Sequence, residues 1–187
     1  MVIFMKKAYI KAFYTDLAAY VAGILAGDWI ELNNDLQDSI NDVKKREFID
    51  LHDGINRLDH EFFITDYDSN LHIDSSNEYA DLDQLVELVN VINEQNLDPE
   101  IANVILDNEC DLDHAIEIIK NNDFVIWNTD STSDYALGYA TATELEFLEG
   151  IPQNIANYFD YESYGRDYRL STSGDFSESG SYYVEIC

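Results

Sequence analysis

The sequence has 187 residues, of which 46% are hydrophobic and 24 are Tyr, Phe or Trp. This content is sufficient for a buried core and excludes a disordered acidic tail. The 38 Asp and Glu residues against 10 Lys and Arg give a formal net charge of −28, far above the roughly 2–8 charges that help a small domain stay soluble.

The negative charge is concentrated after residue 57. Residues 1–57 contain 9 acids and 7 bases, a net −2, whereas residues 58–187 contain 29 acids and 3 bases, a net −26. Residues 58–119 contain 17 carboxylates and no Lys or Arg. Nucleic acids are bound through Lys and Arg, so we expect no direct contact with DNA or RNA. A surface this acidic instead attracts proteins that are built to bind DNA.

Residues 1–78 are expected to form an N-terminal α+β domain. Two stretches rich in β-branched and aromatic residues, 8–14 and 61–67, predict strands. Residues 35–48 predict a helix, because apolar residues recur in them at helical spacing. Lys and Arg lie near the end of this stretch, where cations interact favourably with the helix dipole.

Residues 17–27 superficially resemble a secretory leader, because they are apolar and follow three lysines. Eleven apolar residues are too few to span a bilayer, and Asp16 interrupts their approach. Cys110 and Cys187 lie far apart and form no CxxC motif. We therefore expect a protein of the reducing cytoplasm with no membrane association.

Residues 79–123 are expected to form a central helical domain of three short helices. Each helix has its own start signal: Asp81 for the first, Asp98 with Pro99 for the second and Asp111 for the third. Apolar residues follow each signal at helical spacing. The predicted buried residues are Leu82, Leu85, Val86, Val89, Ile92, Ile101, Val104, Ile105, Leu112, Ala115, Ile116 and Ile119.

Residues 124–187 are expected to form a C-terminal α+β domain. Thr141 and Glu144 have the spacing of a capping box and predict the start of a short acidic helix that Gly150 ends. The other expected elements are a strand at 124–127, a helical turn from Pro152 and a closing strand at 182–186.

Motifs for catalysis or metal binding are scarce. Residues 66–74 carry oxygen ligands at calcium-loop positions, but Leu71 replaces the turn glycine and Asn77 replaces the bidentate Glu. There is no GxSxG, HExxH or Gly-rich phosphate loop, and the four histidines lack ligand-like spacing. We expect no catalytic residues, no metal and no cofactor, and therefore no enzyme.

Several segments resemble the ArdA-type antirestriction proteins. The run NYFDYExYxRD at residues 157–167, within the longer segment 145–170, is similar to the C-terminal signature of that family. Residues 20–29 are similar to its YxxGxxxGxW segment, and residues 65–67 to the end of its DY strand. The resemblance extends over residues 8–187.

The resemblance implies an elongated, acidic homodimer of three small lobes that imitates bent double-stranded DNA. It further implies a bacterial cytoplasmic protein encoded on a mobile genetic element. Its expected partner is the DNA-binding groove, in the specificity and methyltransferase core, of a Type I restriction–modification enzyme. At one charge per about 1.7 Å of duplex, two copies of the chain match roughly 90–100 Å of DNA.

Two alternatives remain open. The mimic could be directed at another DNA-binding protein, such as a nucleoid protein, a repair enzyme or a CRISPR effector. A halophilic or calcium-regulated surface protein would also be acidic, and a calcium titration with salt-dependent melting curves would separate that class.

We expect the partner-binding surface to consist of carboxylates on the central helices and on the predicted acidic C-terminal helix. These are Asp81, Asp83, Glu87, Glu94, Asp98, Glu100, Asp107, Glu109, Asp111, Asp113, Glu117, Glu144, Glu146 and Glu149.

The signature residues are expected to serve packing or the dimer more than direct binding, and Arg166 to pair with Asp160, Glu162 or Asp167. The signature residues are Asn157, Tyr158, Phe159, Asp160, Tyr161, Glu162, Tyr164, Arg166 and Asp167.

Overall fold

The computed structural model describes residues 6–46, 61–74, 78, 80–109 and 111–187. Within them the chain forms helices and small antiparallel sheets, which confirms the α+β prediction. The chain divides into two compact units, Met1–Pro99 and Glu100–Cys187. The finer division into three domains stays a prediction. None of the helices in the described ranges has the length and apolar character of a membrane span.

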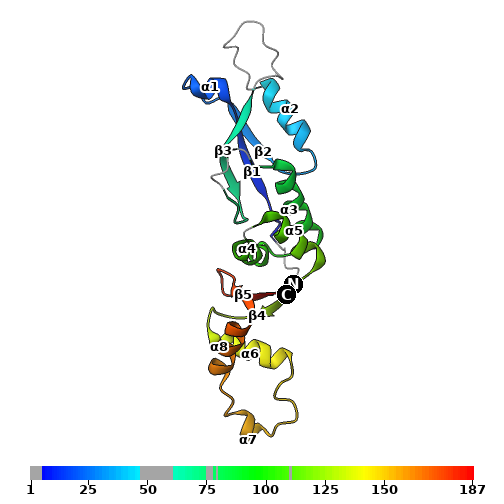
Figure 1. Ribbon diagram of the computed structural model, residues 1–187, viewed down its shortest axis with the longest axis vertical. Coiled ribbons are helices and arrows are strands. Elements are labelled where there is room, and N and C mark those ends of the chain that lie inside the picture. Colours follow the sequence, from blue (N-terminus) through cyan, green and yellow to red (C-terminus); the bar gives the residue numbers. More distant parts are fainter. Residues whose placement is uncertain (1–5, 47–60, 75–77, 79, 110) are drawn as a thin grey trace. The chain divides into compact units, whose positions relative to one another are not determined.

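The first unit is built on a three-stranded antiparallel sheet with the order β2-β1-β3 (Figure 1). The register of β1 with β3 shifts between Phe13 and Tyr14, so the β1 side chains that face the core change at that point. Strands β1 and β3 confirm two predictions from the sequence, whereas β2 was not predicted. The bounds are Ile10–Asp16 for β1, Gly27–Glu31 for β2 and Phe62–Ser69 for β3.

Two helices accompany the strands of this sheet. Helix α1 (Leu17–Val21) begins directly after β1, where the buried Asp16 side chain accepts a hydrogen bond from the backbone N–H of Ala19 at 2.9 Å. Helix α2 (Leu36–Arg46) packs against β2 and confirms the predicted helix over those residues; the last two predicted residues lie outside the described ranges.

Helix α3 (Leu82–Glu94) is fixed at both of its ends. Asp81 caps it as predicted, accepting hydrogen bonds from two backbone N–H groups of the first turn. The Asn93 amide makes two hydrogen bonds, of 3.0 and 2.9 Å, with the backbone of Ala8, just before β1. The predicted buried face was partly wrong, because Leu88 and Val91 are buried in place of Leu82 and Val86.

The second unit begins with two short helices, α4 (Pro99–Asn108) and α5 (Leu112–Asn121). Pro99 is the first helical residue of α4 and Asp111 caps α5, both as predicted. The buried face of α4 is confirmed, whereas on α5 Ile118 is buried and Leu112 is only half-buried.

A second antiparallel sheet has the order β4-β6-β5. The strands are β4 (Phe124–Asn128), β5 (Ser173–Phe176) and β6 (Tyr182–Ile186); β5 was not predicted, because its residues belong to a Ser/Gly-rich stretch. The core against this sheet contains Trp127, Leu137 and Tyr183. The Tyr168 hydroxyl and the Trp127 indole N–H both donate to Glu185 Oε2, at 2.6 and 3.4 Å.

The capping box predicted at Thr141 and Glu144 was wrong. These residues end helix α6 (Asp134–Glu144), which begins behind its N-cap Ser133. Thr141 is fully buried and its hydroxyl donates to the carbonyl of Leu137 at 2.8 Å, a local bond that an interior helical threonine commonly makes. Residues 145–150 are therefore turns and not the predicted acidic helix.

Helices α7 (Gln153–Ala156) and α8 (Tyr161–Ser171) follow, and α8 crosses α6 at two glycines. A Cβ atom on Gly138 would overlap the carbonyl oxygen of Tyr161, and one on Gly165 would overlap that of Asp134. The two backbones thus meet directly. Gly165, which lies within the signature segment, has a packing role, because a larger residue would separate the helices.

We predict that Gly138→Ala and Gly165→Ala each lower the free energy of unfolding by about 1–3 kcal/mol, the usual effect of overpacking. Helix propensity alone predicts the opposite sign, a gain of about 0.5–1 kcal/mol. Urea unfolding of the two variants decides between the signs, and a gain in stability would contradict the close crossing.

Candidate partner-binding surface

The carboxylates predicted on α3 all project into solvent. Asp81, Asp83, Glu87 and Glu94 are exposed. Asp81 and Asp83 lie at the N-terminus of the helix, where a negative charge stabilises both the free N–H groups and the helix dipole. Glu94 lies at the C-terminus, where the dipole disfavours it.

On the next two helices the predicted carboxylates divide into two groups by exposure. The exposed ones are Asp107, Asp111, Asp113 and Glu117, and the half-buried ones are Asp98, Glu100 and Glu109. Eleven of the fourteen predicted carboxylates are therefore exposed, counting those on the C-terminal segment described below.

Two of the half-buried carboxylates make contacts within the protein. The Glu100 carboxylate accepts a hydrogen bond from the Ser179 hydroxyl, in the turn between β5 and β6. The Glu109 carboxylate lies 2.7 Å from Nδ1 of His114, which is on the first turns of α5. These contacts give both residues a structural role, so they are weaker candidates for binding a partner.

The third group, Glu144, Glu146 and Glu149, is exposed but does not lie on a separate helix. Glu144 is the last residue of α6, and Glu146 follows the C-cap with a left-handed φ of 52°. The N–H of Phe147 bonds to the carbonyl of Ala142, the 6→1 bond of a Schellman motif. Glycine usually occupies the position of Glu146, because L-residues are strained there.

Three exposed carboxylates thus lie at helix C-terminal ends: Glu94, Glu144 and Glu146. Each is disfavoured by the helix dipole, typically by about 0.3–1 kcal/mol at a surface. The stability of the fold therefore does not explain these three charges, whereas it does explain the carboxylates that cap helices.

The signature segment at 157–167 includes the N-cap and the first turns of α8. The Asp160 carboxylate caps the helix, accepting hydrogen bonds from the backbone N–H of Ser163 at 3.0 Å and from its hydroxyl at 2.7 Å. These bonds, with a smaller contribution from the positive charge of Arg166, hold the pKa of Asp160 below its usual value. This signature residue has a structural function.

Helix α8 contains one ion pair within itself and forms a second ion pair with α6. Arg166 pairs with Asp167 at 3.1 Å, one of the pairings predicted from the sequence, and both side chains are exposed. Arg169 makes two hydrogen bonds to the carboxylate of Asp134, at 2.8 and 3.4 Å, across the helix crossing. The Asp134 contact raises the pKa of the Arg169 guanidinium.

Three aromatic signature residues, Phe159, Tyr161 and Tyr164, pack against one another and against α6, whereas Tyr158 is 88% exposed. Phe159 lies 5.0 Å from Tyr161 and 5.4 Å from Tyr164, measured between ring centroids. Tyr161 in turn contacts Tyr135 and Tyr139, whose rings stack on each other 6.4 Å apart. Tyr135 and Tyr139 remain 55% and 52% exposed. We call these two tyrosines the α6 face.

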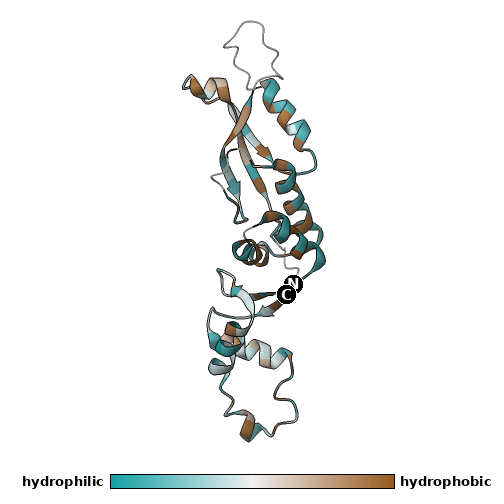
Figure 2. Ribbon diagram, viewed as in Figure 1, coloured by the Kyte–Doolittle hydropathy of each residue, from teal (hydrophilic) through white to brown (hydrophobic). Residues whose placement is uncertain are grey.

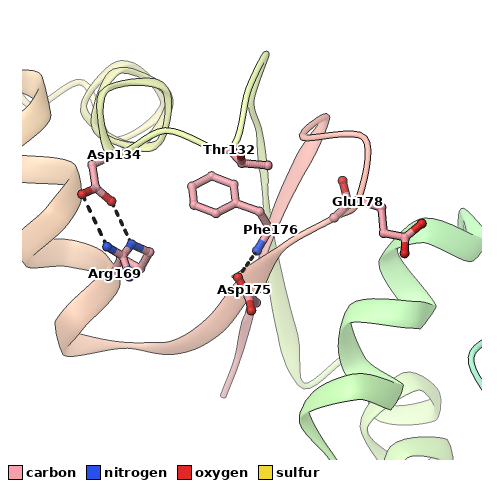
Figure 3. Close-up of a pocket in the computed structure, with 7 residues that line it drawn as sticks. Thr132, Asp134, Arg169, Asp175, Phe176 and Glu178 are labelled. Atoms are coloured by element: carbon pink, nitrogen blue, oxygen red, sulfur yellow. Dashed lines mark hydrogen bonds and ion pairs between the residues drawn. The ribbon is translucent and has the colours of Figure 1, made fainter.

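A hollow of about 510 Å³ lies beside the Arg169–Asp134 ion pair (Figure 3). Its lining residues are Thr132, Asp134, Arg169, Asp175, Phe176, Ser177 and Glu178. The guanidinium of Arg169 points to Asp134, which leaves two acids, Asp175 and Glu178, and two hydroxyls in the lining beside the ring of Phe176.

Comparison with known protein families shows to which family the chain belongs. The family model for antirestriction protein (ArdA) matches residues 12–183, which is nearly the whole length of the chain. The chain therefore belongs to the ArdA family of antirestriction proteins. Membership implies antirestriction function, and so a restriction–modification system as its target. No curated protein matches the chain.

The contact between Glu109 and His114 predicts a pH-dependent interaction. The hydrogen bond from the ring to Glu109, together with the charges of Glu109, Glu117 and Asp111, raises the pKa of His114. A raised folded-state pKa stabilises the fold fully below the unfolded value of about 6.5, and this contribution is lost as the pH rises through the folded-state pKa.

In an NMR titration we expect His114 to titrate above the usual histidine range and to return towards it in Glu109→Gln. A His114 pKa that is unchanged by Glu109→Gln would contradict the contact.

Proposed function

We propose that the protein inhibits restriction by imitating the charge of double-stranded DNA in the DNA-binding groove of a Type I restriction–modification enzyme. The observation that carries this proposal is the set of exposed carboxylates at helix C-terminal ends, which the stability of the fold does not explain. A basic groove would bind these charges as it binds phosphates.

The distribution of charge supports an electrostatic mode of binding. Residues 58–187 carry a net −26, and contacts to phosphates supply most of the sequence-independent affinity of DNA-binding proteins. A mimic that presents carboxylates needs no imitation of base edges. The target enzyme acts on DNA, so we place the inhibitor in the bacterial cytoplasm.

We further propose that the protein acts as a two-fold dimer through the α6 face. Tyr135 and Tyr139 stack and are half exposed, and the nearby Leu145 and Phe147 are each 55% exposed. Exposed aromatic residues of this kind are enriched in protein interfaces. A closed two-fold dimer buries the same surface on both copies and doubles the length of the charged surface.

The mimicry predicts that neutralising carboxylates changes inhibition and stability in opposite directions. The combined variant Glu94→Gln, Glu117→Gln, Glu144→Gln and Glu146→Gln removes four exposed charges. At about 0.2–1 kcal/mol for each exposed pair, we expect inhibition to weaken roughly 5-fold to several hundred-fold. We expect the melting temperature to rise, because self-repulsion and unfavourable dipole contacts are relieved.

A matched control neutralises four exposed carboxylates of the first 57 residues, where the charge is nearly balanced: Glu31→Gln, Asp35→Asn, Asp38→Asn and Asp42→Asn. A DNA-protection assay with the purified enzyme should show near-normal inhibition by the control. Equal loss in both fourfold variants, or no loss in the first, would contradict a localised mimicking surface.

The dimer predicts a monomeric variant. Tyr135→Asp places a charge on the α6 face in the first turn of the helix, where an acid is compatible with the dipole. Sedimentation should show a monomer at concentrations where the unmodified protein is a dimer. Leu170→Asp, at a 71% exposed apolar residue of α8, is the control and should leave the dimer intact. A monomeric unmodified protein that still inhibits would remove the dimer from the mechanism.

A further inference from the structure

An exposed apolar patch lies at the end of the first sheet, on α1 and the residues that lead into β2. Val21 is 79% exposed, Leu25 67% and Tyr20 51%, and two further members of the patch, Ile24 and Trp29, are 40% and 41% exposed. We call these five residues the α1 patch. Figure 2 shows α1 and its surroundings coloured as hydrophobic.

The α1 patch is held in a defined conformation. Asp16, fully buried, caps α1, and the N–H of Ile24 bonds to the carbonyl of Ala19 at 2.9 Å. The ring of Tyr20 lies against Phe63 at 5.2 Å, and the ring of Trp29 lies against Phe13 at 5.4 Å. An interface built on it would therefore lose little conformational entropy on binding.

The patch and Glu94, at the C-terminal end of α3, lie at opposite ends of strand β1. Helix α1 follows the last residue of β1, whereas Asn93 of α3 is hydrogen-bonded to Ala8, just before the first residue. The seven-residue strand separates them by about 20 Å. The α1 patch and Glu94 are thus far enough apart to contact different parts of a partner (Figure 1).

The charge of the chain narrows the choice of partner. Residues 17–27 contain no Asp, Glu, Lys or Arg, so a basic groove gains nothing from the patch. A chain of net −28 is repelled by nucleic acid and by anionic bilayer surfaces. A second copy is disfavoured as well, because the proposed dimer already uses the α6 face and a further self-interface would join dimers into larger assemblies.

We propose that the α1 patch docks on an apolar surface of the restriction enzyme that lies outside its DNA-binding groove. This inference rests on the proposed function and adds a second type of contact to it. Carboxylate contacts are screened by salt, whereas burial of apolar surface is not. The patch therefore supplies the share of affinity that persists at high salt and that DNA, with no equivalent surface, does not have.

The experiment uses the full-length chain and a purified Type I restriction–modification enzyme that it inhibits, with affinity measured over a range of salt concentrations. The neutral double variant Val21→Ser and Leu25→Ser should weaken binding by about 10- to 100-fold at every salt concentration, without altering the dependence on salt. The control Val125→Ser and Leu170→Ser changes two exposed apolar residues elsewhere and should bind normally.

Circular dichroism and melting curves establish that both variants are folded, and Val21→Ala with Leu25→Ala provides a milder change should the serine variant be unstable. Unchanged affinity in the folded α1 variants would overturn the proposal. Two other results would also overturn it. If the unmodified protein binds anionic vesicles and the α1 variant does not, the patch contacts a membrane. If the variant differs in sedimentation but not in enzyme binding, the patch contacts a second copy. Failure of the proposed function is distinguishable, because the unmodified protein would then show no salt dependence at all.

Discussion

Electrostatic self-repulsion is the constraint on which the rest of this structure depends. A chain with net charge −28 must fold although the mutual repulsion of its carboxylates destabilises the compact state. Part of the compensation comes from helix termini, where Asp81, Asp111 and Asp160 cap free N–H groups. The rest comes from apolar and aromatic packing and from the direct backbone contact at Gly138 and Gly165.

The same constraint distinguishes carboxylates that stabilise the fold from carboxylates that have another function. A carboxylate at a helix N-terminus stabilises its helix, so its presence needs no further explanation. A carboxylate at a C-terminus, such as Glu94 or Glu144, destabilises it and calls for another reason. Part of the family signature belongs to the scaffold by this criterion, since Asp160 caps a helix and the rings of Phe159, Tyr161 and Tyr164 pack together.

The sequence predicted most elements whose signals are local. Periodicity and capping residues located α3, α4 and α5, and stretches rich in β-branched and aromatic residues located β1 and β3; β4 and β6 were also predicted. It failed where tertiary contacts decide. Thr141 has capping-box spacing, but it continues a helix that Ser133 starts, and α8 was not predicted, because its apolar spacing is weak and it depends on the crossing at Gly165. Most predicted site carboxylates are exposed, yet their positions relative to helix ends required the structure.

The central claim is that the protein and DNA compete for one groove. The direct measurement titrates labelled protein onto a Type I restriction–modification enzyme in the presence of increasing concentrations of duplex containing its recognition site. Competition predicts that the protein concentration for half-maximal binding rises linearly with the DNA concentration, and that every bound enzyme carries either protein or DNA. A stable ternary complex, with protein affinity independent of DNA, would contradict mimicry.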